Sequence, residues 1–323
     1  MPNVAGVRYP HGRVLLARTR LAYVHLHNLL HDAKRDRSAR VSGYVAIWLP
    51  EEFLLLYLQR GEMVNATTFD GREFTTISLA SALARIPSEP EYGEICFHEA
   101  DDEQLAAMYA AQATPPDSWP AELRVTDPKV LFSYLMATSF DGMVEIRVQG
   151  AMNYLQFNDG AVQRAWLADA AGGSIVQRVT SLFDAESRPG FLVRRWPTPA
   201  GLPAQAAPAL VQAYRELTTA LVQRVADTGR ESAMAIAEHA RKALLPRHPV
   251  LEGFAFTGKP LREPVADTVE LTTAVASWVQ EFMWAAADLQ TTSPEQLLKD
   301  VMWERRHMFQ SSGLLDRIPW KVA

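Results

Sequence analysis

Two histidines four residues apart, His27 and His31, have the spacing that places both imidazoles on one face of a helix, as in zinc sites. The residues between them, Asn28, Leu29 and Leu30, do not include the glutamate of the metalloprotease pattern, and no obvious third ligand follows. We therefore interpret the pair as surface or interface histidines and expect no metal site.

The single cysteine, Cys96, excludes an intramolecular disulfide and a zinc cluster made of thiolates. A lone cysteine fits a reducing compartment. It lies in the alternating segment EICFHE (94–99), which is typical of a strand. A buried packing role is therefore preferred over a catalytic thiolate.

The usual patterns of catalytic and phosphate-binding residues are missing from the sequence. The segment FTGKPL around Lys259 lacks the upstream glycine and the following serine or threonine of a phosphate loop. The acidic segment 99–105 has the composition of a helix start, where carboxylates interact favourably with the dipole. We expect a protein without cofactor or catalytic residues. An enzyme whose site is assembled from distant residues stays open as a weaker alternative.

Four basic residues form the first hypothetical binding site. They lie in a segment that joins a predicted helix to a strand starting at Gly43. Basic side chains in one loop can hold an acidic partner, a phosphate or a nucleotide. A solvated charged loop is the competing interpretation. The four residues are Lys34, Arg35, Arg37 and Arg40.

An apolar face of the first predicted sheet forms the second hypothetical site. Residues alternate between the two faces of a strand, so if Val45 and Ile47 point inward, their neighbours point outward. This outer face is aromatic and needs a cover. Three covers are open: the second copy of the repeated unit described below, the helical C-terminal region, or another chain. The predicted partner-binding residues are Tyr44, Trp48, Leu55 and Tyr57.

The elements that would position these residues occur twice in the sequence. Gly43 and Gly61 are 18 residues apart, and so are Gly142 and Gly160. Apolar residues alternate after the first glycine of each pair at matching distances. The segment NDG (158–160) predicts a tight hairpin turn, because Asn and Gly tolerate positive φ angles. A duplicated unit of order αβββαβ follows from this pattern.

The predicted fold class is α+β, with two tandem units built on small antiparallel or mixed sheets and a bundle-like helical region after them. Each unit should contain a second helix, at 74–85 and at 173–183, before its last strand. Four amphipathic helices are expected after residue 209. The predicted domains are 1–110, 126–196 and 209–323, with linkers at 111–125 and 197–208.

The segment FDGMVEIRVQGAMNYLQFNDGAVQRAWL (140–167) resembles the PATAN domain, a bacterial module found beside receiver domains and other signalling parts. The first copy is similar but has Arg60-Gly61 where the family pattern has an Asp-Gly turn. The resemblance implies regulatory protein–protein interaction and brings no established chemistry with it.

Composition supports a folded protein that does not bind nucleic acid in general. Of 323 residues, 48% are apolar and 21% are charged, which allows a sizeable core. The net charge of the whole chain is −5, although residues 1–50 carry eight Lys/Arg and only two Asp. The rest of the chain is therefore acidic, which does not favour general binding of nucleic acid. No signal peptide or membrane span is recognisable, so a cytoplasmic protein is expected.

The preferred function is a non-enzymatic adaptor or regulatory protein of bacterial signal transduction. Its partner would be a response regulator, a kinase or a small GTPase, with a homo-oligomer as a further option. The alternative is a sensor of a small, nucleotide-like ligand that uses the basic segment 34–40.

Overall fold

The computed structural model describes residues 4–35, 41–87, 89–169, 173–184, 190–226, 230–255 and 263–322. The chain forms two compact units. The first comprises residues 1–77 and 82–203, and the second comprises residues 78–81 and 204–323. With 44% helix, 23% strand and small antiparallel sheets, the α+β class is confirmed.

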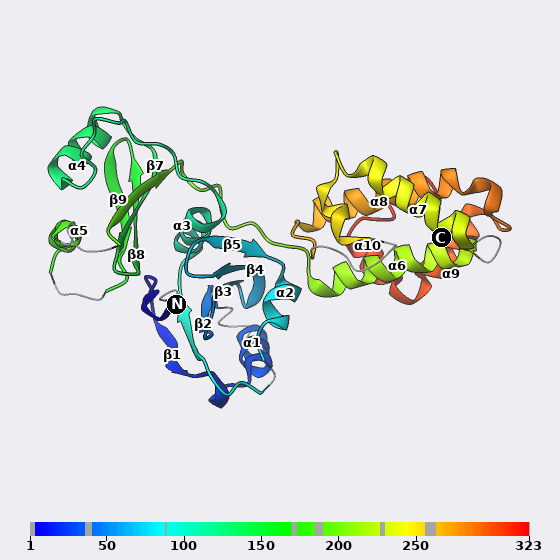
Figure 1. Cartoon of the computed structure of the whole chain (residues 1–323), viewed down its shortest axis with the longest axis horizontal. Helices are drawn as coiled ribbons and strands as arrows, with labels where there is room; N and C mark the ends of the chain where they lie inside the picture. Colours follow the sequence, from blue (N-terminus) through cyan, green and yellow to red (C-terminus); the bar gives the residue numbers. More distant parts are fainter. Residues whose placement is uncertain are drawn as a thin grey trace. The chain divides into compact units, whose positions relative to one another are not determined.

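The first unit begins with a six-stranded sheet in which all neighbouring strands are antiparallel (Figure 1). Its two central strands are buried on both faces, as expected from their nearly continuous apolar residues. In spatial order the strands are β1 (Val14–Arg20), β6 (Glu94–Glu99), β2 (Gly43–Trp48), β3 (Phe53–Gln59), β4 (Glu62–Phe69) and β5 (Phe74–Ile77).

A second sheet in the same unit has four antiparallel strands. Its core side chains pack beneath two helices, α4 (Pro128–Ala137) and α5 (Ile175–Phe183). Asp127 caps α4, and its carboxylate accepts a hydrogen bond from the amide of Lys129 at 2.9 Å. In spatial order the strands are β10 (Leu192–Trp196), β7 (Gly142–Val148), β8 (Ala151–Asn158) and β9 (Ala161–Trp166).

The two sheets share strand order and register. The order β6-β2-β3-β4 in the first corresponds to β10-β7-β8-β9 in the second. Gly43 pairs with Leu58, and Gly142 pairs with Phe157. In each sheet the register of the next strand pair shifts at the equivalent place, after Tyr57 in one and after Gln156 in the other. The predicted alternation therefore places equivalent residues on equivalent faces.

The hairpin turns of the two sheets also share their conformation and support. Arg60 and Asp159 both have φ of 50°, and each is followed by a glycine with positive φ. The amide of Arg60 donates to the hydroxyl of Ser42 at 3.2 Å, and the amide of Asp159 donates to Asp141 at 2.6 Å. Arg60 thus adopts the backbone conformation that the Asn-Asp-Gly turn favours.

Three elements differ from the expectation for a simple αβββαβ unit. The helix predicted at 74–85 is wrong in its first half, because Phe74–Ile77 forms β5 at the sheet edge. Its Phe-Thr-Thr-Ile sequence suits a strand, and Phe74 stacks on Phe69 at 4.4 Å. The remaining helix, α2, spans Leu79–Ala84. Strand β1 precedes the first helix of the predicted αβββαβ order, and α1 (Leu26–Arg35) follows it.

Helix α3 (Asp102–Ala113) lies between the two sheets. It contacts β2, β4 and β5 of the first sheet and β8 of the second. Its buried residues Leu105, Met108 and Ala111 belong to one apolar cluster that includes side chains of both sheets. The helix crosses residue 111, where the sequence predicted a linker.

The N-terminal segment also joins the two sheets. The amide of Arg8 donates to Gly150 O at 3.0 Å, and the amide of Met152 donates to Arg8 O at 2.9 Å. The next residue, Tyr9, packs on Phe53 of β3 with ring centroids 6.0 Å apart. The segment therefore bonds to one sheet through its backbone and to the other through a side chain.

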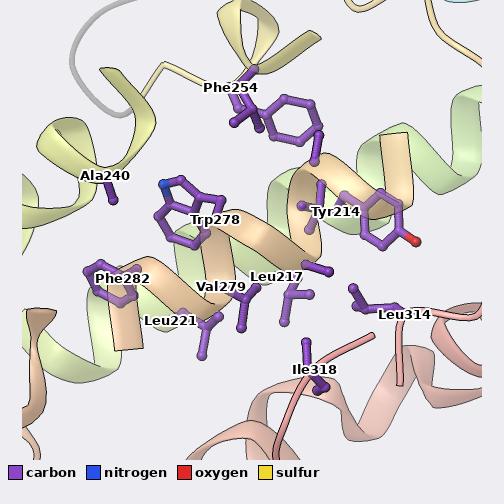
Figure 2. Close-up of a cluster of buried hydrophobic side chains, with 14 of the residues drawn as sticks. Tyr214, Leu217, Leu221, Ala240, Phe254, Trp278, Val279, Phe282, Leu314 and Ile318 are labelled. Atoms are coloured by element: carbon purple, nitrogen blue, oxygen red, sulfur yellow. The ribbon is translucent and has the colours of Figure 1, made fainter. Parts of the chain in front are cut away.

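The second unit is helical. Four of its helices correspond to the four amphipathic helices expected in this region, and the side chain of Ser293 caps the last of these four. Tyr214, Leu217, Trp278 and Phe282 meet in its core (Figure 2). The helices are α6 (Pro208–Ala226), α7 (Arg230–Leu244), α8 (Thr268–Ala285), α9 (Pro294–Met302) and α10 (Arg306–Ser311). None of the helices that the structure describes has the length and apolar character required to span a membrane.

Gly43→Ala tests the close approach of β2 and β6. An added Cβ would stand 2.1 Å from the backbone oxygen of His98, so the strands must separate. We expect the free energy of unfolding in urea to fall by about 2–4 kcal/mol. Gly190→Ala is the control, because its Cβ meets nothing within 4 Å and only the positive φ is strained. Equal losses for the two variants would contradict the observed register.

Candidate functional site

The predicted partner-binding face of the first sheet is covered within the chain. Tyr44, Leu55 and Tyr57 are at most 2% exposed, and Trp48 is 7% exposed. They share an apolar cluster with α3, the N-terminal segment and the second sheet. The hypothesis that these four residues form a surface for another protein is therefore wrong, since the chain itself supplies the cover that the apolar face requires.

The predicted basic loop falls largely outside the described residues. Arg37 and Arg40 lie outside them. Lys34 and Arg35 are the last two residues of α1, and their side chains also fall outside the described part of the structure. His27 and His31 are exposed on α1, with ring centroids 6.5 Å apart. Across the described part of the chain, no group of three or more metal-ligating side chains occurs.

Gln112 of α3 connects α3, the first sheet and the N-terminal segment through buried hydrogen bonds. Its amide oxygen accepts from the hydroxyl of Tyr57 at 3.0 Å and from that of Thr67 at 2.5 Å. Its amide nitrogen donates to the hydroxyl of Tyr9 at 2.8 Å. Burial raises the pKa of both phenols well above the usual value, so they remain neutral hydrogen-bonding groups.

A buried ion pair supports the corresponding face of the second sheet. Glu145 on β7 is 1% exposed and accepts two hydrogen bonds from Arg194 on β10, at 2.8 and 2.5 Å. Arg147 lies 3.5 Å from the same carboxylate. Charged groups are costly to bury without partners, so the two arginines supply the hydrogen bonds and charge that the buried carboxylate requires.

Burial shifts the pKa of two side chains on strand β6, Cys96 and His98. Burial raises the pKa of the Cys96 thiol to about 12, so it is not a thiolate at neutral pH. Burial, and then the neighbouring His11, lower the pKa of His98 to about 4. The rings of His11 and His98 stack at 4.3 Å. The burial of Cys96 and the stacking of His98 on His11 favour packing roles for both side chains.

A hollow of about 320 Å³, here called the Trp166 pocket, is a candidate site in which an aromatic ring and polar side chains meet. Its volume is within the range of small-molecule sites. It opens among the N-terminal segment, α3, the end of β9 and α5. Its lining includes His11, Gln104, Trp166, Leu167, Ala168 and Arg178.

Neighbouring groups fix the polar side chains of the Trp166 pocket. The indole N–H of Trp166 donates to Asp101 at 3.1 Å, and Asp101 also caps α3. The guanidinium of Arg178 donates to Asp169 O at 2.7 Å. Its buried Nε has no hydrogen-bond partner among the described residues. The pocket is thus lined by a held ring and by a guanidinium whose one described hydrogen bond goes to a backbone oxygen.

Trp166 also lines a second hollow of about 210 Å³. This hollow is more apolar and includes Ala107, Met143 and Leu202. Neither hollow is predictable from the sequence, because their residues come from segments far apart in the chain. The one local signal is a tryptophan at the end of the strand-like segment 161–166, and it is half-buried in the structure.

Comparisons with known proteins found no matching family model, no similar curated protein and no similar solved structure.

Gln112→Leu tests the buried hydrogen bonds of α3. Leucine leaves the hydroxyls of Tyr9, Tyr57 and Thr67 without their partner. We expect the free energy of unfolding to fall by about 3 kcal/mol or more. Gln163→Leu, at an exposed position on β9, should change it by less than about 0.5 kcal/mol. Similar values for both variants would show that the network does not stabilise the fold.

His98 predicts a pH dependence of stability. Its pKa is about 4 in the folded chain against 6.5 for the ordinary side chain. Between these values the unfolded chain binds more protons, so stability falls as the pH is lowered from 6.5 to 4. His98→Gln should flatten this fall in urea titrations at several pH values, whereas His25→Gln, at an exposed position, should not. An unchanged slope for His98→Gln would refute the prediction.

Proposed function

We propose that the chain is a non-enzymatic adaptor or regulatory protein of bacterial signal transduction that acts in the cytoplasm through protein–protein interaction. Its partner is a response regulator, a kinase or a small GTPase, or a second copy of the chain. General nucleic-acid binding is not part of the proposal, because the chain beyond residue 50 is acidic.

Exposed tryptophans of the helical unit carry the proposal. Trp284 is 60% exposed and packs edge-on against Trp320, with ring centroids 6.1 Å apart. Trp303 is 65% exposed. Tryptophan is enriched among the residues that contribute most to protein interfaces, because a large rigid ring is buried at little entropic cost. These rings replace the buried face of the first sheet as the proposed contact.

We also propose that the two sheets with their helices are tandem copies of a PATAN-like unit. The equal strand order, the shifted register at equivalent places and the matching turns support this. A duplicated regulatory module fits an adaptor better than an enzyme. In this interpretation β1, β5 and α3 are additions that let the two copies share one core.

A small-ligand sensor is the second candidate function. The basic segment 34–40, proposed for this role from the sequence, lies largely outside the described residues, whereas the Trp166 pocket offers a held aromatic ring and a cation within them. Such a ligand could act together with an adaptor role, by stabilising the part of the chain around α3.

The double variant Trp284→Gln/Trp303→Gln tests the adaptor proposal. Purified chain is immobilised, bacterial lysate is applied, and bound proteins are quantified by mass spectrometry. The oligomeric mass of the free chain in solution is measured by light scattering. We expect the amount of bound response regulator, kinase or GTPase, or the fraction of the chain in its own oligomer, to fall by about tenfold or more. Both positions are exposed, so folding should be retained.

The matched control is Tyr23→Gln/Tyr92→Gln, which removes two aromatic rings of the first unit that are 74% and 72% exposed. Retained binding in this control together with loss in the tryptophan variant supports the proposal. If the tryptophan variant keeps the same partners and the same mass, these rings are not the contact and the proposal fails.

A further inference from the structure

The Trp166 pocket lies within one compact unit and is formed by four segments that are distant in sequence. His11 and Gln104 line it from the N-terminal segment and α3, and Trp166 and Arg178 line it from β9 and α5. The amide nitrogen of Gln104 donates to Pro10 O at 2.5 Å, which holds two of the four segments together. A ligand in the pocket would contact all four.

The aromatic wall of the pocket is held before any ligand arrives. Asp101 accepts the indole N–H of Trp166 with one carboxylate oxygen and the amide of Gln104, at 2.7 Å, with the other. The start of α3 and the ring of Trp166 are therefore fixed by one side chain. A fixed indole ring is a stacking surface for a planar group, and little entropy is lost when the group binds.

The cationic wall has spare capacity for an anion. Among the ion pairs of the described residues, none involves Arg178, whereas Arg8 pairs with Asp169 and Arg164 pairs with Glu103. The contact of Arg178 with Asp169 O uses one of its five donors. A guanidinium with unused donors beside an aromatic ring suits the phosphate or carboxylate of a planar molecule.

We propose that the Trp166 pocket binds a small anion that carries a planar ring, of the chemical class of the mononucleotides. The ring stacks on Trp166, and the anionic group takes the unused donors of Arg178. This inference rests on the second candidate function, the small-ligand sensor, and its failure leaves the adaptor proposal, which uses the tryptophans of the helical unit, untouched.

Nuclear magnetic resonance tests the site with the full chain. The indole N–H resonance of Trp166 is assigned from Trp166→Phe, and then AMP, GMP, adenosine and inorganic phosphate are titrated separately. The expected result is a saturable shift of this resonance with AMP or GMP, and binding at least about tenfold weaker for adenosine and for phosphate. No shift with either nucleotide at millimolar concentration overturns the proposal. Equal binding of adenosine or of phosphate overturns it as well, because one of the two walls would then be unused.

Arg178→Gln should weaken nucleotide binding by about tenfold or more. The matched control is Arg164→Gln, which removes another arginine near Trp166 that pairs with Glu103 and does not line the pocket. Unchanged affinity in the Arg178 variant, or an equal loss in the control, contradicts the assignment. If Arg178→Gln is unfolded by circular dichroism, Arg178→Lys gives the same test, because it keeps the charge and loses the planar donors.

Discussion

The apolar face of β2 and β3 has to be removed from water, and the first unit is arranged around this constraint. Both faces of these strands are buried. Alternate residues of a strand point to opposite faces of the sheet, so one packing layer covers only one apolar face. A second layer must cover the other face. Helix α3, the N-terminal segment and the second sheet supply it together. This packing joins two similar sheets into a single core.

Polar groups inside this core restrict how the layers can be placed. Gln112 can satisfy Tyr9, Tyr57 and Thr67 only when α3, the N-terminal segment and β3–β4 are all in position. Glu145 needs Arg194 in the same way. Buried polar groups are costly without partners, so a shifted packing would lose several hydrogen bonds at once. The Trp166 pocket is a consequence, because α3 and β9 meet beside the same core.

The sequence predicted what depends on local pattern and missed what depends on distant contacts. The strands, their register and the turns at Gly61 and Gly160 follow from alternation and from positive φ angles. The segment 74–77 was assigned to a helix because pairing with β4 is not visible locally. The cover of Tyr57 and the lining around Arg178 also come from distant segments, and no spacing rule brings these together.

The accessibility of Cys96 tests most directly whether the chain covers its own apolar face. This thiol is the chain's single cysteine, it is 1% exposed, and it lies in the same cluster as Tyr44 and Tyr57. Its reaction rate with a water-soluble maleimide should be at least about 100-fold slower in the native chain than in urea. The rate should rise in Gln112→Leu. Comparable rates in the native and unfolded chains would show that the face is open to solvent.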